Sequence, residues 1–539
     1  MIHPLIRTIF SLLLLGASTR HLDKLGVIKQ VIYKQNSLAA PNFTAAETTI
    51  IMKIILLFMK RLLLPALAIT NLSLQCHAAE MPVPTEPAQN VILVLIDDMG
   101  YGDIAAHGNP EVKTPNLDTL RETSAHFTNF AVSPTCAPTR AALLTGKHEF
   151  KSSVTHTLRP MRNMDPASTT IAELFQRKGF ATGLFGKWHL GQSEQYGPWF
   201  RGFDETLTVE GDNQRSHFDP VLLQNRKPVK FQGYRTDIIF DEAMQFMEGR
   251  QADAEPFFCY LATYTPHAPL KVPEEYIEPY KHLDPDTAAY YGMVANVDEN
   301  LGRLLAKMKA TGLDANTLLI VMTDNGGTFG VDTWNAGMRG RKGAAWLGGT
   351  RALSFWRYGQ TYDPGERGQM TGHVDVLPTL ADLFELEVSD DLAAQLDGDS
   401  LRPLLDEAGA ELDESRMQVH HRGRWPHSAP WENHKYTHCA VRWKNYQLIR
   451  VHLEDDCQLC SKISRRAAGR GHLGYSKNVE HYRMTEDGAW ELYDIEADPF
   501  QEHNLAAAKP EIRDKMIAHY EAWWTDVAPH LAKGAEREP

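Results

Sequence analysis

The sequence is poor in cysteine for its length, with 6 cysteines among 539 residues. So few thiols cannot build the disulfide framework of a small scaffold, and a hydrophobic core must hold the fold. Basic residues are also in deficit, because 55 lysines and arginines face 68 aspartates and glutamates, for a formal net charge of −13. This balance removes the usual electrostatic drive toward a phosphate backbone, so nucleic acid is not an expected partner.

Long hydrophobic runs are missing as well. After Met59 the chain has a basic tip, an apolar run well short of the roughly 20 residues of a membrane span, and small residues up to Ala79. This is the layout of a secretory signal. We interpret residues 1–79 as a leader, with a misplaced start upstream of the signal, and expect a secreted or periplasmic protein without a stable membrane span. A lipid anchor at Cys76 is a weaker alternative.

The rest of the composition is that of an ordinary globular protein, with 43% hydrophobic and 23% charged residues. Short apolar runs at 91–96, 180–185, 256–262 and 318–322 alternate with amphipathic segments such as 170–178 and 287–309. The alternation predicts an α/β fold with a large, mostly parallel sheet flanked by helices. An acidic, loop-like stretch follows residue 405. We therefore expect one domain over 85–415 and a small α+β domain over 416–530, with antiparallel strands and a terminal helix.

Polar side chains follow the predicted strands, where the carboxyl ends of a parallel sheet place binding sites. Two pairs of hard oxygen ligands stand out: Asp97 with Asp98, and Asp324 with Asn325 in T-D-N-G-G. Such ligands suit Ca²⁺ or Mg²⁺. Each pair alone is also a common turn sequence, so the metal interpretation depends on their combination. Without a cation, gathered carboxylates should raise one another's pKa values.

The segment 133–147 reads S-P-T-C-A-P-T-R-A-A-L-L-T-G-K. Pro138 suits a first helical turn, so Cys136 lies at a predicted helix N-terminus, which favours an anion. Arg140 on the same helix is always charged and could hold an oxyanion, although a surface salt bridge is its simpler interpretation. For Cys136 alone, a small buried apolar cysteine would be the simpler interpretation.

This segment resembles the signature of the type I sulfatases of the alkaline phosphatase superfamily, Cys-x-Pro-Ser/Thr-Arg with a following Thr-Gly. The resemblance extends through G-K-W-H-L-G with Lys187 and His189, T-P-H-A-P with His267, and G-R-K-G with Lys342. It covers nearly the whole chain after the leader. It implies that a maturation enzyme converts Cys136 to formylglycine. It also implies one Ca²⁺, with Mg²⁺ as the alternative, bound by the modified residue 136 and by Asp97, Asp98, Asp324 and Asn325.

By the same resemblance, the reaction is the hydrolysis of a sulfate ester in two steps. A hydroxyl of the formylglycine hydrate attacks sulfur, and the second hydroxyl later expels sulfate as the aldehyde returns. Lys187 and Lys342 would bind sulfate oxygens, and His267 with Lys342 would protonate the leaving alcohol. His189 would assist the breakdown of the covalent intermediate. A leaving alkoxide needs such a proton donor, and growing oxygen charge needs fixed cations.

Export and the segment 420–438 suggest a sulfated carbohydrate as substrate. That segment mixes Trp425, Trp431 and Tyr436 with Arg422 and Arg424, so rings could pack on sugar faces while cations meet sulfates. A polar loop over the small domain is an equal alternative. A phosphate or phosphonate ester hydrolase and an inactive surface binding protein are the rival functions. The roles of Cys439 and of Cys457-x-x-Cys460, as half of a metal site, a disulfide or free thiols, stay open.

Overall fold

The computed structural model describes residues 88–535, apart from residues 159, 210–215, 360, 408, 426–429, 452–484 and 486–487. All of these belong to one compact unit, Met81–Pro539. The predicted leader with Cys76, and the pair Cys457 and Cys460, lie outside the described residues. Within the described ranges, no helix combines the length and the hydrophobicity needed to cross a membrane.

A ten-stranded mixed sheet forms the centre of this unit, in the order β12-β2-β11-β9-β1-β8-β4-β5-β6-β7. Its middle strands β9, β1, β8, β4 and β5 are parallel, whereas antiparallel pairs occur toward both edges. The predicted fold class is confirmed. The strands are β1 (Asn90–Ile96), β2 (Ala125–Phe127), β4 (Ala181–Gly186), β5 (Glu205–Thr208), β6 (Val221–Gln224), β7 (Lys227–Lys230), β8 (Phe257–Ala262), β9 (Thr317–Thr323), β11 (Ser354–Tyr358) and β12 (Gly365–Arg367).

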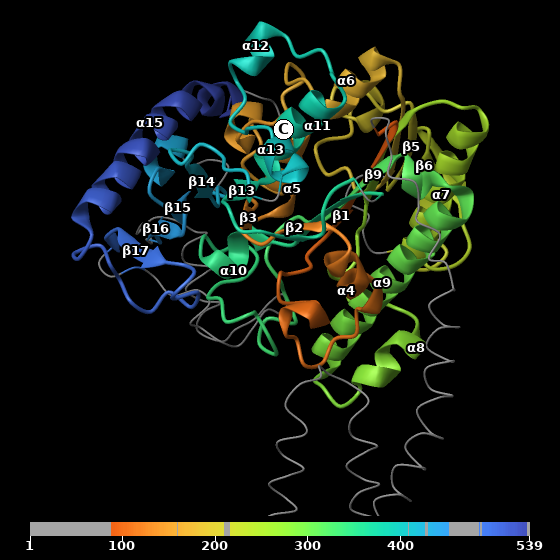
Figure 1. The fold of residues 1–539 in the computed structure, drawn as a ribbon, viewed down its shortest axis with the longest axis horizontal. Coiled ribbons are helices and arrows are strands. Elements are labelled where there is room, and N and C mark those ends of the chain that lie inside the picture. Colours follow the sequence, from red (N-terminus) through yellow and green to blue (C-terminus); the bar gives the residue numbers. More distant parts are fainter. Residues whose placement is uncertain are drawn as a thin grey trace, which may run out of the picture. The chain divides into compact units, whose positions relative to one another are not determined.

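Helices cover both faces of the sheet, and β1 shows how (Figure 1). Its even-numbered residues Ile92 and Val94 join a core with α4, α7 and α9, while Val91 and Leu93 join a second core with α5, α6 and α11. Because both faces of such a strand are buried, its sequence is a continuous apolar run. The helices are α4 (Pro115–Glu122), α5 (Cys136–Thr145), α6 (Ile171–Lys178), α7 (Arg235–Ala252), α8 (Glu274–Ile277), α9 (Pro285–Thr311), α10 (Leu347–Thr350), α11 (Val376–Leu383), α12 (Asp390–Ala393) and α13 (Arg402–Asp406).

Local capping sets the ends of the helices that the sequence predicts. In α6, Thr170 and Glu173 form a reciprocal capping box, and Gly179 ends the helix in the left-handed conformation. In α9, the Asp284 carboxylate accepts hydrogen bonds from two main-chain N–H groups of the first turn. Short single-turn 3-10 helices fill several connections: η1 (Ala105–His107), η2 (Glu149–Ser152), η3 (Pro198–Phe200), η4 (Glu278–Tyr280), η5 (Leu313–Ala315), η6 (His373–Asp375) and η7 (Trp431–His434).

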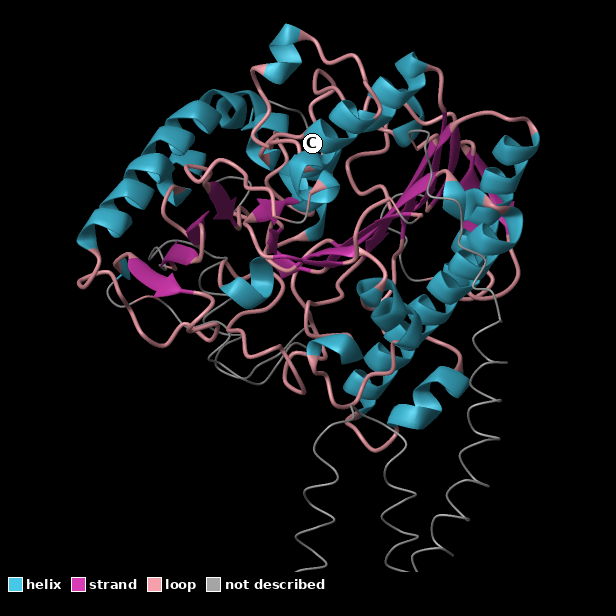
Figure 2. Ribbon diagram, in the orientation of Figure 1, coloured by secondary structure: helices cyan, strands magenta, loops and turns pink. Residues whose placement is uncertain are grey.

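Two smaller sheets complete the architecture (Figure 2). One joins β10 (Arg351–Ala352), β3 (Phe130–Ala131) and β13 (Thr371–Gly372), and the other is the antiparallel series β14 (Gln418–His421), β15 (Cys439–Trp443), β16 (Tyr446–Arg450) and β17 (Glu491–Asp494). The helix α15 (Pro510–Ala535) packs on this C-terminal sheet. It contains Pro529 and continues to Ala535, with Leu531 buried in the shared core.

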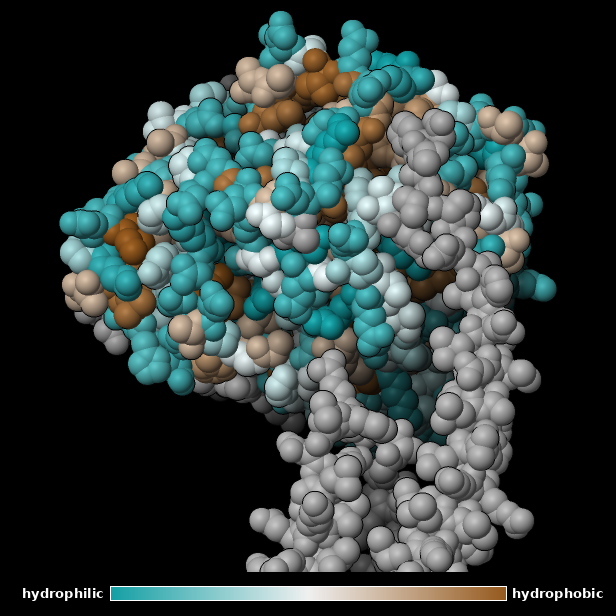
Figure 3. Space-filling model, viewed as in Figure 1, coloured by the Kyte–Doolittle hydropathy of each residue, from teal (hydrophilic) through white to brown (hydrophobic). Residues whose placement is uncertain are grey.

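Surface hydropathy follows the usual pattern of a globular protein. On the face in view, hydrophilic residues predominate and hydrophobic ones lie scattered among them (Figure 3). Among the described residues, the exposed large hydrophobic side chains are those of Leu158, Phe200, Phe218 and Val221. The division near residue 415 stays a prediction, since the C-terminal sheet shares buried contacts with the rest; Phe150, for example, belongs to its core.

Candidate active site

The parallel centre of the sheet brings the predicted polar residues to one edge. Asp97 and Asp98 follow β1, Asp324 and Asn325 follow β9, and His267 follows β8. Lys187 and His189 follow β4, which pairs with β8. These four strands are neighbours and run parallel, so their carboxyl ends meet. The site therefore lies where an α/β sheet ordinarily places one.

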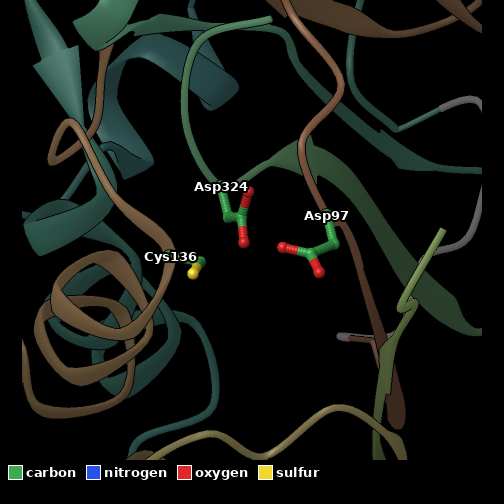
Figure 4. Close-up of side chains that lie close together, drawn as sticks. All are labelled: Asp97, Cys136 and Asp324. Carbon is green, nitrogen blue, oxygen red and sulfur yellow. The ribbon is translucent and has the colours of Figure 1, made fainter. Parts of the chain in front are cut away.

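Cys136 reaches this edge from the helix α5, of which it is the first residue. Its side chain is buried, and candidate ligand atoms of Cys136, Asp97 and Asp324 all lie within 4.8 Å of one another. Figure 4 shows the thiol and the two carboxylates directed toward a common space. The N-terminal end of α5, with its unpaired N–H groups, thus faces the carboxylate cluster.

Each of the three site aspartates forms an ion pair with a different base. Arg140 Nη2 donates to Asp324 Oδ2 at 2.9 Å, with both side chains fully buried, so the surface alternative for Arg140 is wrong. The other two pairs join Lys187 Nζ to Asp97 Oδ2 at 2.6 Å and Lys342 Nζ to Asp98 Oδ1 at 2.5 Å. These charges cancel in pairs, so a bound divalent cation would give the site a net positive charge suited to an anionic ester.

The pKa directions separate the three carboxyl groups. Burial, followed by the nearby Asp97 carboxylate, raises the pKa of Asp324 to about 7. Burial also opposes ionisation of Asp97 and Asp98, but Lys187 and Lys342 respectively lead the charges that outweigh it, so their pKa values lie below the usual range. Asp97 does raise the pKa of Asp98, as expected of gathered carboxylates, but for these two groups the cations outweigh the repulsion, so the expected net rise is found only for Asp324.

Buried oxygen atoms that accept no hydrogen bond indicate where a cation fits. Asp97 Oδ1 and Asn325 Oδ1 are buried and accept no hydrogen bond within the described part of the chain. Asn325 Nδ2 donates to Asp98 Oδ1 at 3.1 Å, which turns the amide oxygen of Asn325 away from that contact. Buried oxygens of this kind are costly unless a ligand or water meets them. The donor set of carboxylate and amide oxygens fits a hard divalent cation.

His189 faces the nucleophile position with a defined tautomer. Its Nε2 donates to the main-chain carbonyl of Thr157 at 3.0 Å, and its Nδ1 lies 3.5 Å from Cys136 Sγ. Burial, followed by the charge of Lys187, keeps the pKa of His189 well below its usual value. The ring is therefore neutral, with the Nδ1 lone pair available to accept a proton from residue 136.

His267 is the other imidazole of the site. Its Nδ1 donates to the main-chain carbonyl of Ala268 at 2.5 Å, and its Nε2 lies 3.6 Å from Asp98 Oδ2. Burial, then the charge of Lys342, lowers the pKa of His267 to about 4. Of the two predicted proton donors, His267 donates through Nδ1 to the main chain, whereas Lys342 donates to the site carboxylate of Asp98.

Sequence reasoning missed the residues that support this constellation. Thr157 accepts the hydrogen bond of His189, the hydroxyl of Thr263 accepts from the main-chain N–H of Asp97 at 3.2 Å, and Tyr290 contacts the main chain of Asp98. None belongs to a recognisable motif. All three contacts use a main-chain atom, which side-chain patterns do not report, and all join distant parts of the chain.

The aromatic segment 420–438 is only partly consistent with a substrate surface. Trp425 is 3% exposed and lies in the core beneath β14, with its ring stacked on His434 and edge-on to Phe150. A buried ring cannot pack on a sugar, so the predicted role of Trp425 is wrong. Trp431 and Tyr436 are partly buried against the same core. Arg424, by contrast, is partly exposed and donates to Thr157 Oγ1 at 2.7 Å.

Comparison with known proteins identifies the family. Residues 89–386, more than half of the chain, match the family model described as Sulfatase. The chain belongs to the sulfatase family. The ulvan-active sulfatase of Formosa agariphila is 27% identical over 458 residues, covering 79% of this chain and 78% of the relative. The N-acetylgalactosamine-6-sulfatase of Homo sapiens is 27% identical over 423 residues, covering 69% and 78%.

The fold comparison agrees with this membership. The crystal structure of Ps i-CgsB superposes with a TM-score of 0.69 at 25% identity, covering 81% of this chain and 93% of that one. The predicted recognition of a sulfatase of the alkaline phosphatase superfamily is confirmed, and the protein is a sulfuric ester hydrolase. Membership favours sulfate esters over the phosphate-ester and inactive-binding alternatives.

Proposed function

We propose that this sulfatase is exported and removes sulfate from a sulfated carbohydrate, with a formylglycine made from Cys136 and one Ca²⁺. The main observation in support is the buried cluster of Cys136, Asp97 and Asp324 at the carboxyl edge of the sheet. A thiol in a purely structural core would have no reason to share space with two carboxylates. The leader on which export depends lies outside the described residues, so export is supported by the sequence pattern alone.

The proposed ligands of the cation are the modified residue 136 and the oxygens of Asp97, Asp98, Asp324 and Asn325. When bound, the cation and the formylglycine hydrate would supply charge stabilisation and the attacking oxygen. The buried oxygens of Asp97 and Asn325 that accept no hydrogen bond support this assignment. Mg²⁺ is the alternative ion, and the number of protein oxygens favours Ca²⁺, which takes six to eight oxygen ligands.

The basic residues would divide the remaining work. Lys187, Lys342 and Arg140 are held by buried ion pairs beside the cluster, where fixed cations stabilise charge that grows on sulfate oxygens. The Nδ1 lone pair of His189 faces residue 136 and would take its proton when the intermediate breaks down. The leaving alcohol would receive its proton from His267 or Lys342, which both face Asp98.

The carbohydrate assignment draws on relatives with sugar-directed names, an N-acetylgalactosamine-6-sulfatase and an ulvan-active sulfatase. Each matches this chain over about four fifths of its own length. The catalytic groups alone would serve any sulfate ester, so the substrate class has to be tested on substrates rather than on the chemistry. A sulfated oligosaccharide is expected to be a better substrate than a small aryl sulfate.

The experiment that tests the mechanism is mass spectrometry of active enzyme from a host with a formylglycine maturation system. We expect formylglycine in the peptide that contains residue 136, and no turnover by Cys136→Ala. Cys259→Ala is the matched control, because Cys259 is equally buried but lies within β8, away from the site edge. Full activity from enzyme that holds only unmodified Cys136 would contradict the proposal.

A further inference from the structure

A tight turn after β14 fixes the direction of the Arg424 side chain. Gly423 and Arg424 both have left-handed backbone conformations, with φ values of 60° and 63°. A side chain at Gly423 would lie 2.1 Å from the Thr155 carbonyl oxygen, and the main-chain N–H of Arg424 donates to that same oxygen at 3.2 Å. The left-handed conformation costs a non-glycine residue on the order of 1–2 kcal/mol. Such strain concentrates at functional positions.

The turn places the guanidinium close to the catalytic centre. Arg424 Nη2 donates to Thr157 Oγ1, and the carbonyl of the same threonine accepts the hydrogen bond of His189. His189 in turn lies 3.5 Å from Cys136 Sγ. Arg424, Thr157 and His189 are all partly exposed, and Leu158 beside them is 70% exposed. The guanidinium therefore lies at the solvent-facing rim of the site. Thr157 and His189 connect it to the nucleophile through successive contacts.

Arg424 also differs from the other cations around the nucleophile. Lys187, Lys342 and Arg140 each have a carboxylate partner. Across the ranges that the structure describes, Arg424 has no carboxylate partner, and its Nε is buried and donates no hydrogen bond. A partly buried guanidinium that lacks a counter-ion pays a desolvation cost, which an anionic ligand group would offset through charge-assisted hydrogen bonds.

We propose that Arg424 binds a second anionic group of the substrate, a sulfate or carboxylate near the sulfate ester that is hydrolysed. This group would lie on the reacting sugar or on the sugar next to it. The inference rests on the proposed function, since it assumes a carbohydrate sulfate ester at residue 136. In this proposal Arg424 determines substrate specificity and takes no part in the reaction, because its guanidinium does not touch the reacting sulfate.

The test compares Arg424→Gln with the wild type on three kinds of substrate. These are a small aryl sulfate, a monosulfated sugar, and the same sugar with an added carboxylate or second sulfate. A charge-assisted hydrogen bond contributes about 1.5–3 kcal/mol, so the ratio of kcat/KM for the dianionic over the monosulfated sugar should fall about 10- to 100-fold. Arg424→Lys should keep part of the preference, and added salt should reduce it.

Two controls separate binding from structural support. Arg226→Gln removes an arginine that stacks on Trp199 and Phe200 at a surface turn, and it should leave the ratio unchanged. Thr157→Val removes the hydroxyl partner of Arg424. The thermal unfolding temperature of each variant shows whether it is still folded. Equal loss on all substrates by Arg424→Gln would show that Arg424 only supports His189 and would overturn the inference. No change in the ratio would overturn it as well. Failure of the wild type on every sulfate ester would instead contradict the proposed function.

Discussion

The hydroxyl of Tyr290, near the start of the long helix α9, donates a hydrogen bond to the main-chain carbonyl of Asp98 at 2.9 Å. The same hydroxyl lies 2.5 Å from Asp103 Oδ2, which also accepts from the main-chain N–H of Gly100 at 2.8 Å. Asp98 itself has a left-handed backbone with φ of 65°. The helix therefore braces a strained turn that presents one of the candidate metal ligands.

We expect Tyr290→Phe to weaken Ca²⁺ binding about 10- to 100-fold, because partners that orient metal ligands contribute affinity of that size. Calorimetric titration of metal-free enzyme measures the effect without relying on turnover. Tyr291→Phe is the matched control, since the Tyr291 hydroxyl contacts Asn109 and Gly330 instead. Equal Ca²⁺ affinity in wild type and Tyr290→Phe would show that the turn holds Asp98 without this hydrogen bond.

Removing a proposed metal ligand should abolish turnover more completely than removing a residue that holds a ligand in place, such as Tyr290. Asp97→Ala leaves the buried Lys187 without its carboxylate, at a cost of about 3–5 kcal/mol in stability. Asp324→Ala leaves Arg140 with only the more distant carboxylate of Asp97, 3.6 Å away. Chelation of the wild type should also stop turnover, and added Ca²⁺ should restore it. Asp382→Ala, which removes an exposed ion pair with Arg402, is the control. Undiminished activity after exhaustive chelation would remove the cation from the mechanism.

Much of this arrangement could be predicted because it is encoded locally. The predicted strands at 91–96 and 318–322 are fully buried and therefore appear as unbroken apolar runs, and they match β1 and β9 within one or two residues. The strand β2, next to the edge strand β12, has only three residues, and its pairing with β11 joins distant segments, so no local pattern reports it. The burial of Arg140 follows from its pairing with Asp324, which no spacing in the sequence shows.

Glu149 is a buried acid in the 3-10 helix η2, which follows the nucleophile helix α5 in the chain. Glu149 is fully buried, and burial raises its pKa to about 8, against a smaller lowering by its own main-chain N–H and the Ser133 hydroxyl. His148 Nδ1 and His373 Nε2 lie 3.7 Å and 4.0 Å from Oε2, but burial lowers their own pKa values, that of His373 to about 3. Asp397 adds a further unfavourable charge, so at neutral pH Glu149 is protonated.

The sign of the pH effect follows from this raised pKa. The unfolded chain releases the Glu149 proton near pH 4.3, whereas the folded protein keeps it to about pH 8. The stability that the proton contributes is complete below the lower value and declines by about 1.4 kcal/mol per pH unit up to the higher one. Glu149→Gln should lose this decline, so its stability relative to wild type should grow between pH 5 and pH 8. Urea unfolding at several pH values measures it.

The exposed Glu414→Gln serves as the control, because its carboxylate pairs with Lys444 at the surface. The titrations of His148 and His373 are present in all three proteins and cancel in the comparison. Parallel stability curves for wild type and Glu149→Gln would mean that Glu149 ionises in the folded protein near its ordinary pKa.

Trp425 can separate folding from substrate binding in the segment 420–438, for which a carbohydrate surface and a polar loop were equal expectations. Its ring lies between His156, Phe150 and His434, and it is 3% exposed. Trp425→Ala should therefore cost about 3–5 kcal/mol of unfolding free energy, as large-to-small core substitutions do. Per folded molecule, kcat/KM should fall equally on a sulfated oligosaccharide and an aryl sulfate, unlike the selective loss expected for Arg424→Gln. Trp425→Phe keeps an aromatic ring in the core and should lose less stability. If Trp425→Ala kept wild-type stability and lost only oligosaccharide turnover, the ring would have to leave this core and reach the substrate.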